Sequence, residues 1–313
     1  MKILVTGVGG QLGHDVVNEL SKRGHQGIGS DLAPVYHGIA DDTPVTRAEY
    51  VSMDITDSEL VLRTVEEVKP DAVMHCAAWT SVDAAEEQEN RETVWLVNAK
   101  GTENICLACK KQDIPMMYLS TDYVFDGQGE EPWKPDCQDY RPLNVYGKTK
   151  LEGEKSVSHL LDKYFIVRIA WVFGKNGKNF IKTMLQAAKT HDQLMVVSDQ
   201  IGTPTYTYDL ARLLVDMIET DKYGYYHATN EGGYISWYDF TKEIFRQAVA
   251  MGRTEYDEKH VSVKAVSTQE YGISKAARPF NSRLDRSKLI EQGFTPLPEW
   301  KDAVRRYLQE IEF

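Results

Sequence analysis

The sequence predicts an α/β protein built on a Rossmann-type, doubly wound parallel sheet, with a smaller C-terminal substrate lobe. Two observations predict this class. Short apolar, β-branched segments alternate with amphipathic segments of helical period from the start of the chain to residue 171, which is typical of a parallel sheet covered by helices. In addition, a glycine-rich turn follows the first apolar segment at once and leads into a helix.

The glycine-rich turn is Gly7-Val-Gly-Gly10-Gln-Leu-Gly13, between a strand expected at 1–6 and an amphipathic helix expected at 14–20. Gly7 permits the tight turn, Gly10 lets a ligand approach the backbone, and Gly13 lets the helix pack closely on the strand. The free N–H groups at the helix N-terminus favour a phosphate there. The spacing is GxxGxxG rather than the commoner GxGxxG, and an ordinary turn is the alternative. In this context we expect dinucleotide binding.

A second strand is expected at 26–31, ending in Asp31. The distance of Asp31 from the glycines is close to that at which a carboxylate meets the adenosine ribose hydroxyls. Its charge would repel a 2′-phosphate, so the sequence favours NADH over NADPH, although a simple turn role is the alternative. Residues 32–49 are polar and interrupted by Pro34 and Pro44, and we expect a surface insertion there.

The alternation then continues as expected of a doubly wound sheet. Asp54 follows the third strand, where it can reach the adenine, and the small residues at 77–80 leave the fourth strand where the backbone must pass a flat cofactor ring. His75 lies inside the apolar fourth strand, so a packed core histidine is favoured over a catalytic one. The expected strands are 50–53, 72–76, 115–120 and 165–170, and the expected helices are 57–69, 98–112 and 146–160.

Beyond residue 171 the alternation becomes irregular, and we expect this part to fold back over the crevice of the sheet. The predicted division is a nucleotide-binding domain at 1–171, with return segments around 205–230, and a sugar-nucleotide-binding lobe at 172–204 and 231–313. The expected helices lie near 179–190, 206–219, 236–251 and 298–311, with short strands near 194–197 and 225–228.

Composition limits the partners and the compartment. A net charge of −11 argues against a nucleic acid or an anionic membrane surface as partner. No apolar run is long enough to span a membrane, and the first strand begins at the first residue with no signal peptide before it, so we expect a cytoplasmic protein. Four cysteines agree with a reducing compartment. Cys106 and Cys109 lack a second pair to complete a tetrahedral site, so we expect buried helix cysteines and no metal.

A tyrosine and a lysine at helical spacing are the first catalytic candidates. Tyr146 and Lys150 lie four residues apart on one face of a predicted helix. A nearby ammonium favours phenolate, so we expect a lowered pKa for Tyr146 and proton exchange with an alcohol oxygen during hydride transfer. Only this pair follows the fifth strand by one loop. The same spacing recurs at Tyr238/Lys242 and Tyr271/Lys275, which we interpret as structural.

Hydroxyl groups at the end of the fifth strand supply the next candidates. Ser120, Thr121 and Asp122 fall at its carboxyl end, where side chains of parallel strands face the ligand crevice. A hydroxyl donor there can hold the substrate carbonyl oxygen beside the tyrosine. Local hydrogen bonds in a strand-end turn are the alternative. The order of glycines, hydroxyl and tyrosine–lysine pair favours catalysis.

These motifs, in this order, resemble the extended short-chain dehydrogenase/reductase family. Longer segments narrow the resemblance to the dTDP-4-dehydrorhamnose reductases, and the likeness covers essentially the whole chain. The segments that carry it are Ala77-Ala-Trp-Thr-Ser-Val-Asp-Ala-Ala-Glu86, Ser120-Thr-Asp-Tyr-Val-Phe-Asp-Gly127, Pro142-Leu-Asn-Val-Tyr-Gly-Lys-Thr-Lys-Leu-Glu-Gly-Glu154, Asp199-Gln-Ile-Gly-Thr-Pro-Thr205 and Ala277-Arg-Pro-Phe-Asn-Ser-Arg-Leu-Asp285.

The resemblance implies reduction of the C4 ketone of dTDP-4-dehydro-L-rhamnose to dTDP-L-rhamnose with NADH or NADPH. It implies Tyr146 as proton donor, Lys150 as the residue that orients the nicotinamide ribose, and Thr121 and Asp122 as contacts of the sugar. The remaining implied contacts are Gly10, Gln11 and Leu12 with the pyrophosphate, Asp31 with the ribose, Asp54 and Ile55 with the adenine, Ala77, Ala78 and Trp79 with the nicotinamide, Trp171 with the deoxysugar and Arg278 with the diphosphate.

Several alternatives stay open at this point. Trp171 can instead be a core aromatic at a strand end, and Arg278 a surface ion pair. Residues 32–49 are longer than expected of a compact reductase, and Trp79 stands where such enzymes often have histidine or another residue, so the nicotinamide pocket can differ. A non-catalytic relative, the regulatory subunit of methionine adenosyltransferase, shares the pattern, and a nucleotide-sugar epimerase shares the fold. A homodimer is possible, and the base preference is not determined by these residues.

Overall fold

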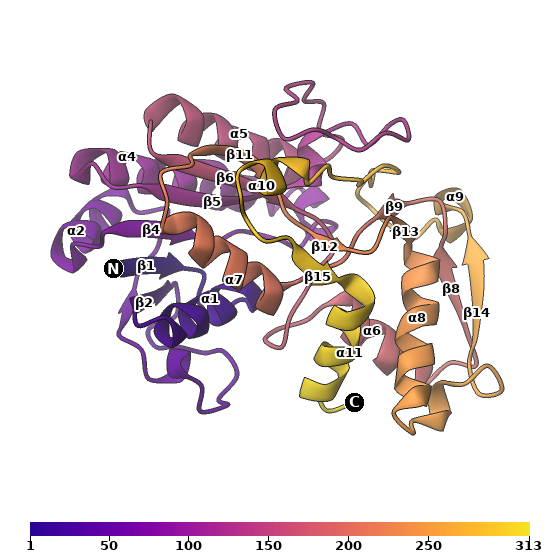
Figure 1. Cartoon of the computed structure of the whole chain (residues 1–313). Coiled ribbons are helices and arrows are strands. Elements are labelled where there is room, and N and C mark those ends of the chain that lie inside the picture. Colours follow the sequence, from indigo (N-terminus) through magenta and orange to yellow (C-terminus); the bar gives the residue numbers. More distant parts are fainter.

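The computed structural model describes all 313 residues and contains one large sheet of seven strands in the order β11-β6-β5-β4-β1-β2-β3. All neighbouring strands in it are parallel, which confirms the predicted fold class. The sheet forms the left part of the view in Figure 1. Its strands are β1 (Lys2–Thr6), β2 (Gln26–Asp31), β3 (Tyr50–Ser52), β4 (Ala72–His75), β5 (Met116–Thr121), β6 (Tyr164–Ile169) and β11 (Gly224–His227).

Helices cover both faces of this sheet, so its central strands β1, β4, β5 and β6 are mostly buried and largely apolar. Successive side chains of β1 show the two layers, because Ile3 belongs to one apolar cluster and Leu4 to the other. The first cluster includes residues of α1 (Gln11–Lys22) and α7 (Thr207–Ile218). The second includes residues of α2 (Ser58–Val68), α4 (Thr102–Gln112) and α5 (Val145–Leu160).

The helix expected at 98–112 begins earlier than predicted and is not regular. It starts as α3 (Arg91–Trp95), continues as a π-helical segment (Leu96–Gly101) and ends as α4. The predicted start was wrong because Arg91, Glu92 and Thr93 are exposed polar residues, which leave no apolar period in the sequence. Extra turns of π-helix are frequent at functional sites, and this segment contains Asn98, described below.

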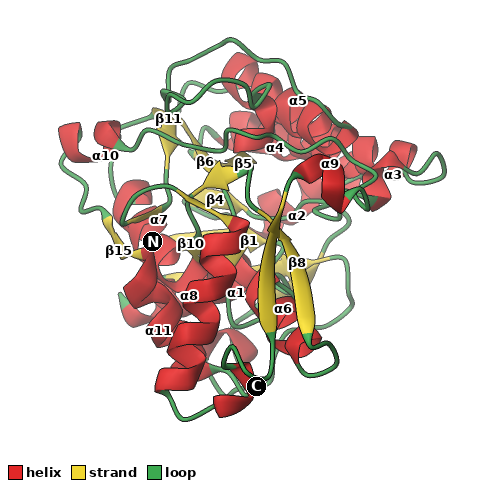
Figure 2. Cartoon of the chain, turned by 90° about the vertical axis from the view of Figure 1, so that its right-hand side faces the viewer, coloured by secondary structure: helices red, strands yellow, loops and turns green.

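The C-terminal lobe has a core of its own, formed by 17 buried residues that include Phe240 and Tyr307. Its main helices are α6 (Phe180–Ala188), α8 (Trp237–Ala250) and α11 (Trp300–Glu310), which lie beside the large sheet in Figure 1. Two longer strands, β8 (Gln193–Val197) and β14 (Ser262–Val266), run parallel and lie side by side in Figure 2. The four predicted helices beyond residue 171 are thus present, including α7, which packs on α1 of the large sheet.

Several short elements were not predicted. They are mostly two to five residues long, and the strands among them pair with strands distant in sequence, so no local period reveals them. They are β7 (Val172–Phe173), β9 (Ile201–Gly202), β10 (Thr205–Tyr206), β12 (Asn230–Glu231), β13 (Ile235–Ser236), β15 (Leu297–Glu299), α9 (Thr268–Tyr271), α10 (Ser287–Glu291), the longer β14, and 3-10 turns at Pro44–Thr46, Ala84–Glu86, Asp122–Val124 and Thr254–Tyr256.

The insertion at 32–49 lies mainly on the surface, with Leu32 and Val35 about two-thirds exposed (68% and 67%). Val45 is the exception, because its side chain is buried against the α1 layer. None of the helices combines the length and the hydrophobicity that a membrane-spanning segment needs. The four cysteines are unpaired, and Cys106 and Cys109 are buried in α4.

Candidate active site

The glycine-rich turn brings β1, α1 and the loop after β4 into close contact. Gly7 has a left-handed backbone (φ +70°), and a Cβ there would stand 2.6 Å from the backbone nitrogen of Ala77. A Cβ on Gly13 would stand 2.8 Å from the carbonyl carbon of Gly7. Both distances are far below van der Waals contact, so only glycine fits at these two positions.

The N-terminus of α1 is open to a ligand. Gly10 precedes the helix and has no side chain to cap the first N–H groups. The Leu12 side chain is buried in the core, so only its backbone faces the turn, and the Gln11 side-chain oxygen accepts a hydrogen bond from Asn179 at 3.1 Å. Uncapped amides, a positive dipole end and a side-chain-free cradle are the features that bind a pyrophosphate. A dinucleotide therefore fits here.

Asp31 lies at the carboxyl end of β2 beside the same turn. Its carboxylate accepts hydrogen bonds from the backbone N–H of Gly9 at 3.0 Å and of Leu32 at 2.8 Å. The carboxylate thus ties β2 to the glycine-rich turn and stays half-buried at its surface.

Asp54 and Ile55 lie after β3 on the other side of the crevice. The Asp54 carboxylate accepts hydrogen bonds from the N–H and hydroxyl of Thr56, which fixes a tight turn. Ile55 is buried and packs on Gly101, where a Cβ would stand 2.7 Å from the Ile55 side chain. The two residues border the end of β3, where the sequence places the adenine.

His75 is packed inside the sheet, as the sequence predicts. Its Nδ1 lies 2.6 Å from the Thr6 hydroxyl oxygen and its Nε2 lies 3.2 Å from that of Thr102. Burial, together with the charge of Lys150, lowers the pKa of His75 to about 3, so the ring is neutral. The Thr6 hydroxyl also accepts a hydrogen bond from the backbone N–H of Ala77, which begins the loop after β4.

Asn98 holds that loop and was missed at the sequence level. Its side-chain oxygen accepts a hydrogen bond from the Trp79 N–H at 2.8 Å, and its amide donates to the Trp79 carbonyl at 3.1 Å. The same amide donates to the Thr149 hydroxyl of α5 at 3.1 Å. Ala77, Ala78 and Trp79 are half-buried along this loop. Asparagine is a poor helix former, so its presence near the start of the predicted helix was the available signal.

The helix that holds Tyr146 and Lys150 has a fixed N-terminus. Asn144 caps α5 by accepting a hydrogen bond from the Gly147 N–H at 2.8 Å. Glu86 accepts a second one from the Val145 N–H at 2.7 Å. Two caps on the first turn define the position of Tyr146, which directly follows Val145.

Tyr146 does not have the lowered pKa that its spacing to Lys150 predicts. Burial raises the pKa, the Asp122 charge raises it further, and the nearby Thr121 hydroxyl opposes the rise only in part. The Tyr146 ring also meets the edge of Tyr123, with 5.6 Å between ring centres. The expectation for the pKa of Tyr146 was wrong because sequence spacing carries no information about burial.

The Lys150 side chain is buried against the ring of Tyr118 on β5. It is 3% exposed, and its Nζ lies over the Tyr118 ring, 4.0 Å from the ring centre. Burial lowers the pKa of Lys150 to about 7, against the opposing charges of Glu154 and Cys76. Lys150 does not offset the effect of burial on the pKa of Tyr146.

The carboxyl end of β5 holds polar atoms without partners. The Thr121 hydroxyl donates to Asp122 Oδ1 at 3.0 Å, whereas Asp122 Oδ2 and the Ser120 hydroxyl are buried and make no hydrogen bond. Burial raises the pKa of Asp122 to about 6, while the nearby Ser282 and Thr121 hydroxyls oppose the rise. Buried polar atoms without partners are costly, so a ligand that bonds to them here would be bound more tightly.

Trp171 follows β6 and packs against two apolar clusters, as the core role left open by the sequence requires. Its backbone has φ +51°, a left-handed conformation that costs a bulky residue energy and is often found at functional sites. Its half-buried ring stacks on Trp237 of α8, with 3.7 Å between centres and 15° between planes. The stack joins the sheet to the lobe.

Arg278 forms an ion pair, one of the two roles that the sequence left open. Its partner is Asp83, in the loop after β4, and its Nε donates to Ser274 at 3.2 Å. Its guanidinium also lies 3.5 Å from the hydroxyl of Tyr123, the residue that contacts Tyr146. Arg278 is thus held at the border of the site.

A buried ion pair behind α5 was also missed. Arg168 of β6 donates to both carboxylate oxygens of Glu154 at 2.8 and 2.7 Å, and both side chains are at most 1% exposed. Tyr146, Lys150 and Glu154 follow each other at spacings of four, so they share one face of α5. The signal was a charged residue inside the apolar run of the sixth strand.

The two other tyrosine–lysine pairs lie in the C-terminal lobe. Tyr238 and Lys242 are both on α8, where the ammonium lies 5.6 Å from the centre of the Tyr238 ring. Tyr271 ends α9, and Lys275 forms an ion pair with Glu87. Neither pair lies at the carboxyl end of the large sheet.

Comparison with known proteins agrees with this arrangement. The family described as RmlD substrate binding domain matches residues 1–313. The dTDP-4-dehydrorhamnose reductase of Aggregatibacter actinomycetemcomitans is 38% identical over 97% of each chain. Among solved structures, a dTDP-4-dehydrorhamnose reductase of Clostridium acetobutylicum is 38% identical, with a TM-score of 0.86 and 99% of each chain covered. That of Bacillus anthracis, in complex with NADP, is 36% identical, with a TM-score of 0.85 over 99% of this chain and all of the other.

Proposed function

This chain belongs to the RmlD substrate-binding-domain family and is an NAD(P)H-dependent oxidoreductase, and from that premise we propose that it reduces the C4 ketone of dTDP-4-dehydro-L-rhamnose to dTDP-L-rhamnose. One observation supports this most directly. Thr121, Asp122 and Tyr146 meet at the carboxyl end of β5, next to a crevice that begins with the glycine-rich turn. This is where ligands bind in doubly wound sheets.

The cofactor of the proposed reaction is a nicotinamide dinucleotide. The backbone N–H groups at the start of α1 would hold the pyrophosphate, Asp31 the adenosine ribose, and the residues after β3 the adenine. The loop after β4 would border the nicotinamide with Ala77, Ala78 and Trp79. Asn98 holds this loop by hydrogen bonds to the backbone N–H and carbonyl of Trp79. When bound, the reduced nicotinamide supplies the hydride for C4. Asp31 favours NADH, because a carboxylate repels a 2′-phosphate.

Tyr146 would donate the proton to the C4 oxygen. Burial raises its pKa, so the phenol is protonated at neutral pH, as a general acid must be before the reaction. The Thr121 hydroxyl would donate a hydrogen bond to the same oxygen and so stabilise the charge that develops there. Lys150, already buried on the same helix face, would hold the nicotinamide ribose.

The substrate would lie between the sheet and the C-terminal lobe. Asp122 Oδ2 and the Ser120 hydroxyl are free to bond sugar hydroxyls, and the Trp171 ring would cover the apolar face with the C6 methyl. Arg278 would bind the diphosphate by exchanging its bond to Asp83. Contacts with the distant nucleotide would orient C4 at Tyr146.

The decisive experiment follows NADH absorbance with dTDP-6-deoxy-L-lyxo-4-hexulose and identifies the product by NMR. We expect stoichiometric oxidation of NADH and formation of dTDP-L-rhamnose. Tyr146→Phe should lower kcat by about 10²–10⁴-fold with dinucleotide binding retained, and Tyr238→Phe should change little. Dinucleotide binding without turnover of any nucleotide 4-ketosugar would refute the proposal and favour a regulatory protein. Product formed without net NADH consumption would indicate an epimerase.

The division into a nucleotide-binding domain at 1–171 with return segments and a sugar-nucleotide lobe stays a prediction. So do the homodimer, the absence of a nucleic-acid partner and the cytoplasmic location. Four unpaired cysteines support a reducing compartment.

A further inference from the structure

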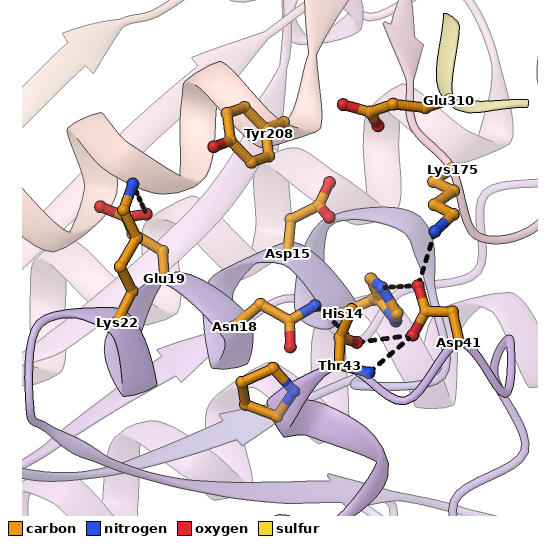
Figure 3. Close-up of a pocket in the computed structure, with 11 residues that line it drawn as sticks. His14, Asp15, Asn18, Glu19, Lys22, Asp41, Thr43, Lys175, Tyr208 and Glu310 are labelled. Carbon is orange, nitrogen blue, oxygen red and sulfur yellow. Dashed lines mark hydrogen bonds and ion pairs between the residues drawn. The ribbon is translucent and has the colours of Figure 1, made fainter.

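A polar cluster of His14, Asp41, Thr43 and Lys175 connects the insertion at 32–49 to α1 and to the loop after β7, as Figure 3 shows. Asp41 lies at its centre and accepts hydrogen bonds from Lys175 at 2.8 Å and from the Thr43 hydroxyl at 2.6 Å. The Nε2 of His14 on α1 lies 3.6 Å from the same carboxylate. The cluster borders a cavity of about 260 Å³ between α1, the insertion and α7. It ties the insertion both to α1 and to the loop after β7.

A second set of hydrogen bonds holds residues 36–39 of the insertion next to the glycine-rich turn. The Tyr36 hydroxyl lies 2.7 Å from Nδ1 of His14. Asn176 accepts a hydrogen bond from the Ile39 N–H at 3.1 Å, and its amide donates to the Gly9 carbonyl at 2.8 Å. One buried asparagine therefore bonds both the insertion and the turn. Residues 36–39 are held over the turn by contacts from both sides.

This course places the His37 imidazole against Gly9. A Cβ on Gly9 would stand 2.7 Å from the His37 Nε2, so the ring occupies the space beside the Gly9 backbone. The N–H of Gly9 donates to Asp31, the carboxylate that the proposed function assigns to the adenosine ribose. His37 and Asp31 therefore flank the same residue.

Other side chains with donors near this place are already engaged. Lys175 is paired with Asp41, and the Tyr36 hydroxyl is bonded to His14. His37 is an exposed residue whose ring makes no hydrogen bond within the protein, so its nitrogens are available to a ligand at the turn. An imidazole N–H is a good donor to phosphate oxygens.

We propose that His37 is a specificity-determining residue that donates a hydrogen bond to the 2′-phosphate of NADPH and so offsets the repulsion by Asp31. This inference rests on the proposed function, because it assumes a dinucleotide on the glycine-rich turn. Under this proposal the insertion has a function in cofactor binding. It places a hydrogen-bond donor beside the 2′-phosphate, the group that distinguishes NADPH from NADH. The chain would then use both cofactors, with Asp31 and His37 acting in opposite directions.

The test measures binding of NADP⁺ and NAD⁺ to the full chain by calorimetry, without sugar nucleotide. His37→Ala should weaken NADP⁺ about tenfold, the loss expected for one hydrogen bond to a charged group, and leave NAD⁺ within about twofold. His37→Arg should tighten NADP⁺, a gain that an unfolded variant cannot give. Val35→Ala is the matched control, because Val35 is an exposed residue of the same insertion and should change neither constant.

The outcomes separate the two proposals. An unchanged ratio of the NADP⁺ and NAD⁺ constants in His37→Ala overturns the inference and leaves the proposed function intact. Equal weakening of both dinucleotides also overturns it, because His37 would then only support the turn. If the unmodified chain binds neither dinucleotide, the proposed function fails and the inference fails with it.

Discussion

Replacing Arg168 with leucine should destabilise the protein by about 3–5 kcal/mol, the cost of leaving a buried charge without its partner. The structure places Arg168 at 0% exposure, where it donates to both Glu154 oxygens, to the Pro135 carbonyl and to the Tyr140 hydroxyl. Leucine makes none of these hydrogen bonds, and the Glu154 carboxylate stays buried with no cation beside it. The loss should be greater at pH 7 than at pH 5, because an unpaired buried carboxylate favours its protonated form.

The double variant Arg168→Leu/Glu154→Leu distinguishes the lost pair from lost packing. Removing both charges leaves no isolated charge, so it should cost less than either single change. Urea unfolding followed by circular dichroism at pH 5 and pH 7 gives the free energies. Single-variant losses below about 1 kcal/mol, or a double variant as unstable as the sum of both, would refute the argument. Activity should fall as well, since Glu154 shares its helix face with Tyr146 and Lys150.

Two further predictions concern carboxylates of the site. Asp31→Ala should raise the NADPH/NADH ratio of kcat/KM by about tenfold, because it removes one negative charge beside the ribose; an unchanged ratio in steady-state kinetics would contradict that role. Burial raises the pKa of Asp122 to about 6, above its ordinary 3.8, so its contribution to stability falls as the pH rises between these values. Relative to the unmodified protein, Asp122→Asn should therefore gain about 1–3 kcal/mol from pH 4 to pH 7 in urea titrations, and no such gain would show that burial of Asp122 is not costly.

The strands and helices of the large sheet were predictable because their burial leaves a period in the sequence. β1 and β4 are buried on both faces and are apolar segments in the sequence. α2 has an apolar face of helical period, and Pro70 follows its end. The short strands beyond residue 171 were not predictable, since β9 and β13 consist of two residues each and pair across the lobe. The short helix at Arg91–Trp95 buries only Val94, so it carries no apolar period.

In the site, the identities of the main residues were predictable from the sequence, whereas their burial and its effect on their pKa values were not. Thr121, Asp122 and Tyr146 were predicted from their order along the chain, and the structure brings them together. The pKa of Tyr146 was predicted in the wrong direction, because burial and the Asp122 charge outweigh the lysine four residues on. Asn98 was missed because its role depends on Trp79 and Thr149, which are distant in sequence.

The large sheet is completed by the second half of the chain, and this affects the order in which the protein can fold during synthesis. β6 keeps one edge unpaired until β11 is made, and α1 lacks its neighbour α7 until residue 218. At about 5–20 residues per second, the stretch from Ile169 to His227 takes about 3–12 s to synthesise. During those seconds α6 and β8 emerge while the apolar side of α1 and an open strand edge are still exposed. The nascent chain is therefore most exposed to aggregation at this stage, and truncation before residue 227 would make that exposure permanent.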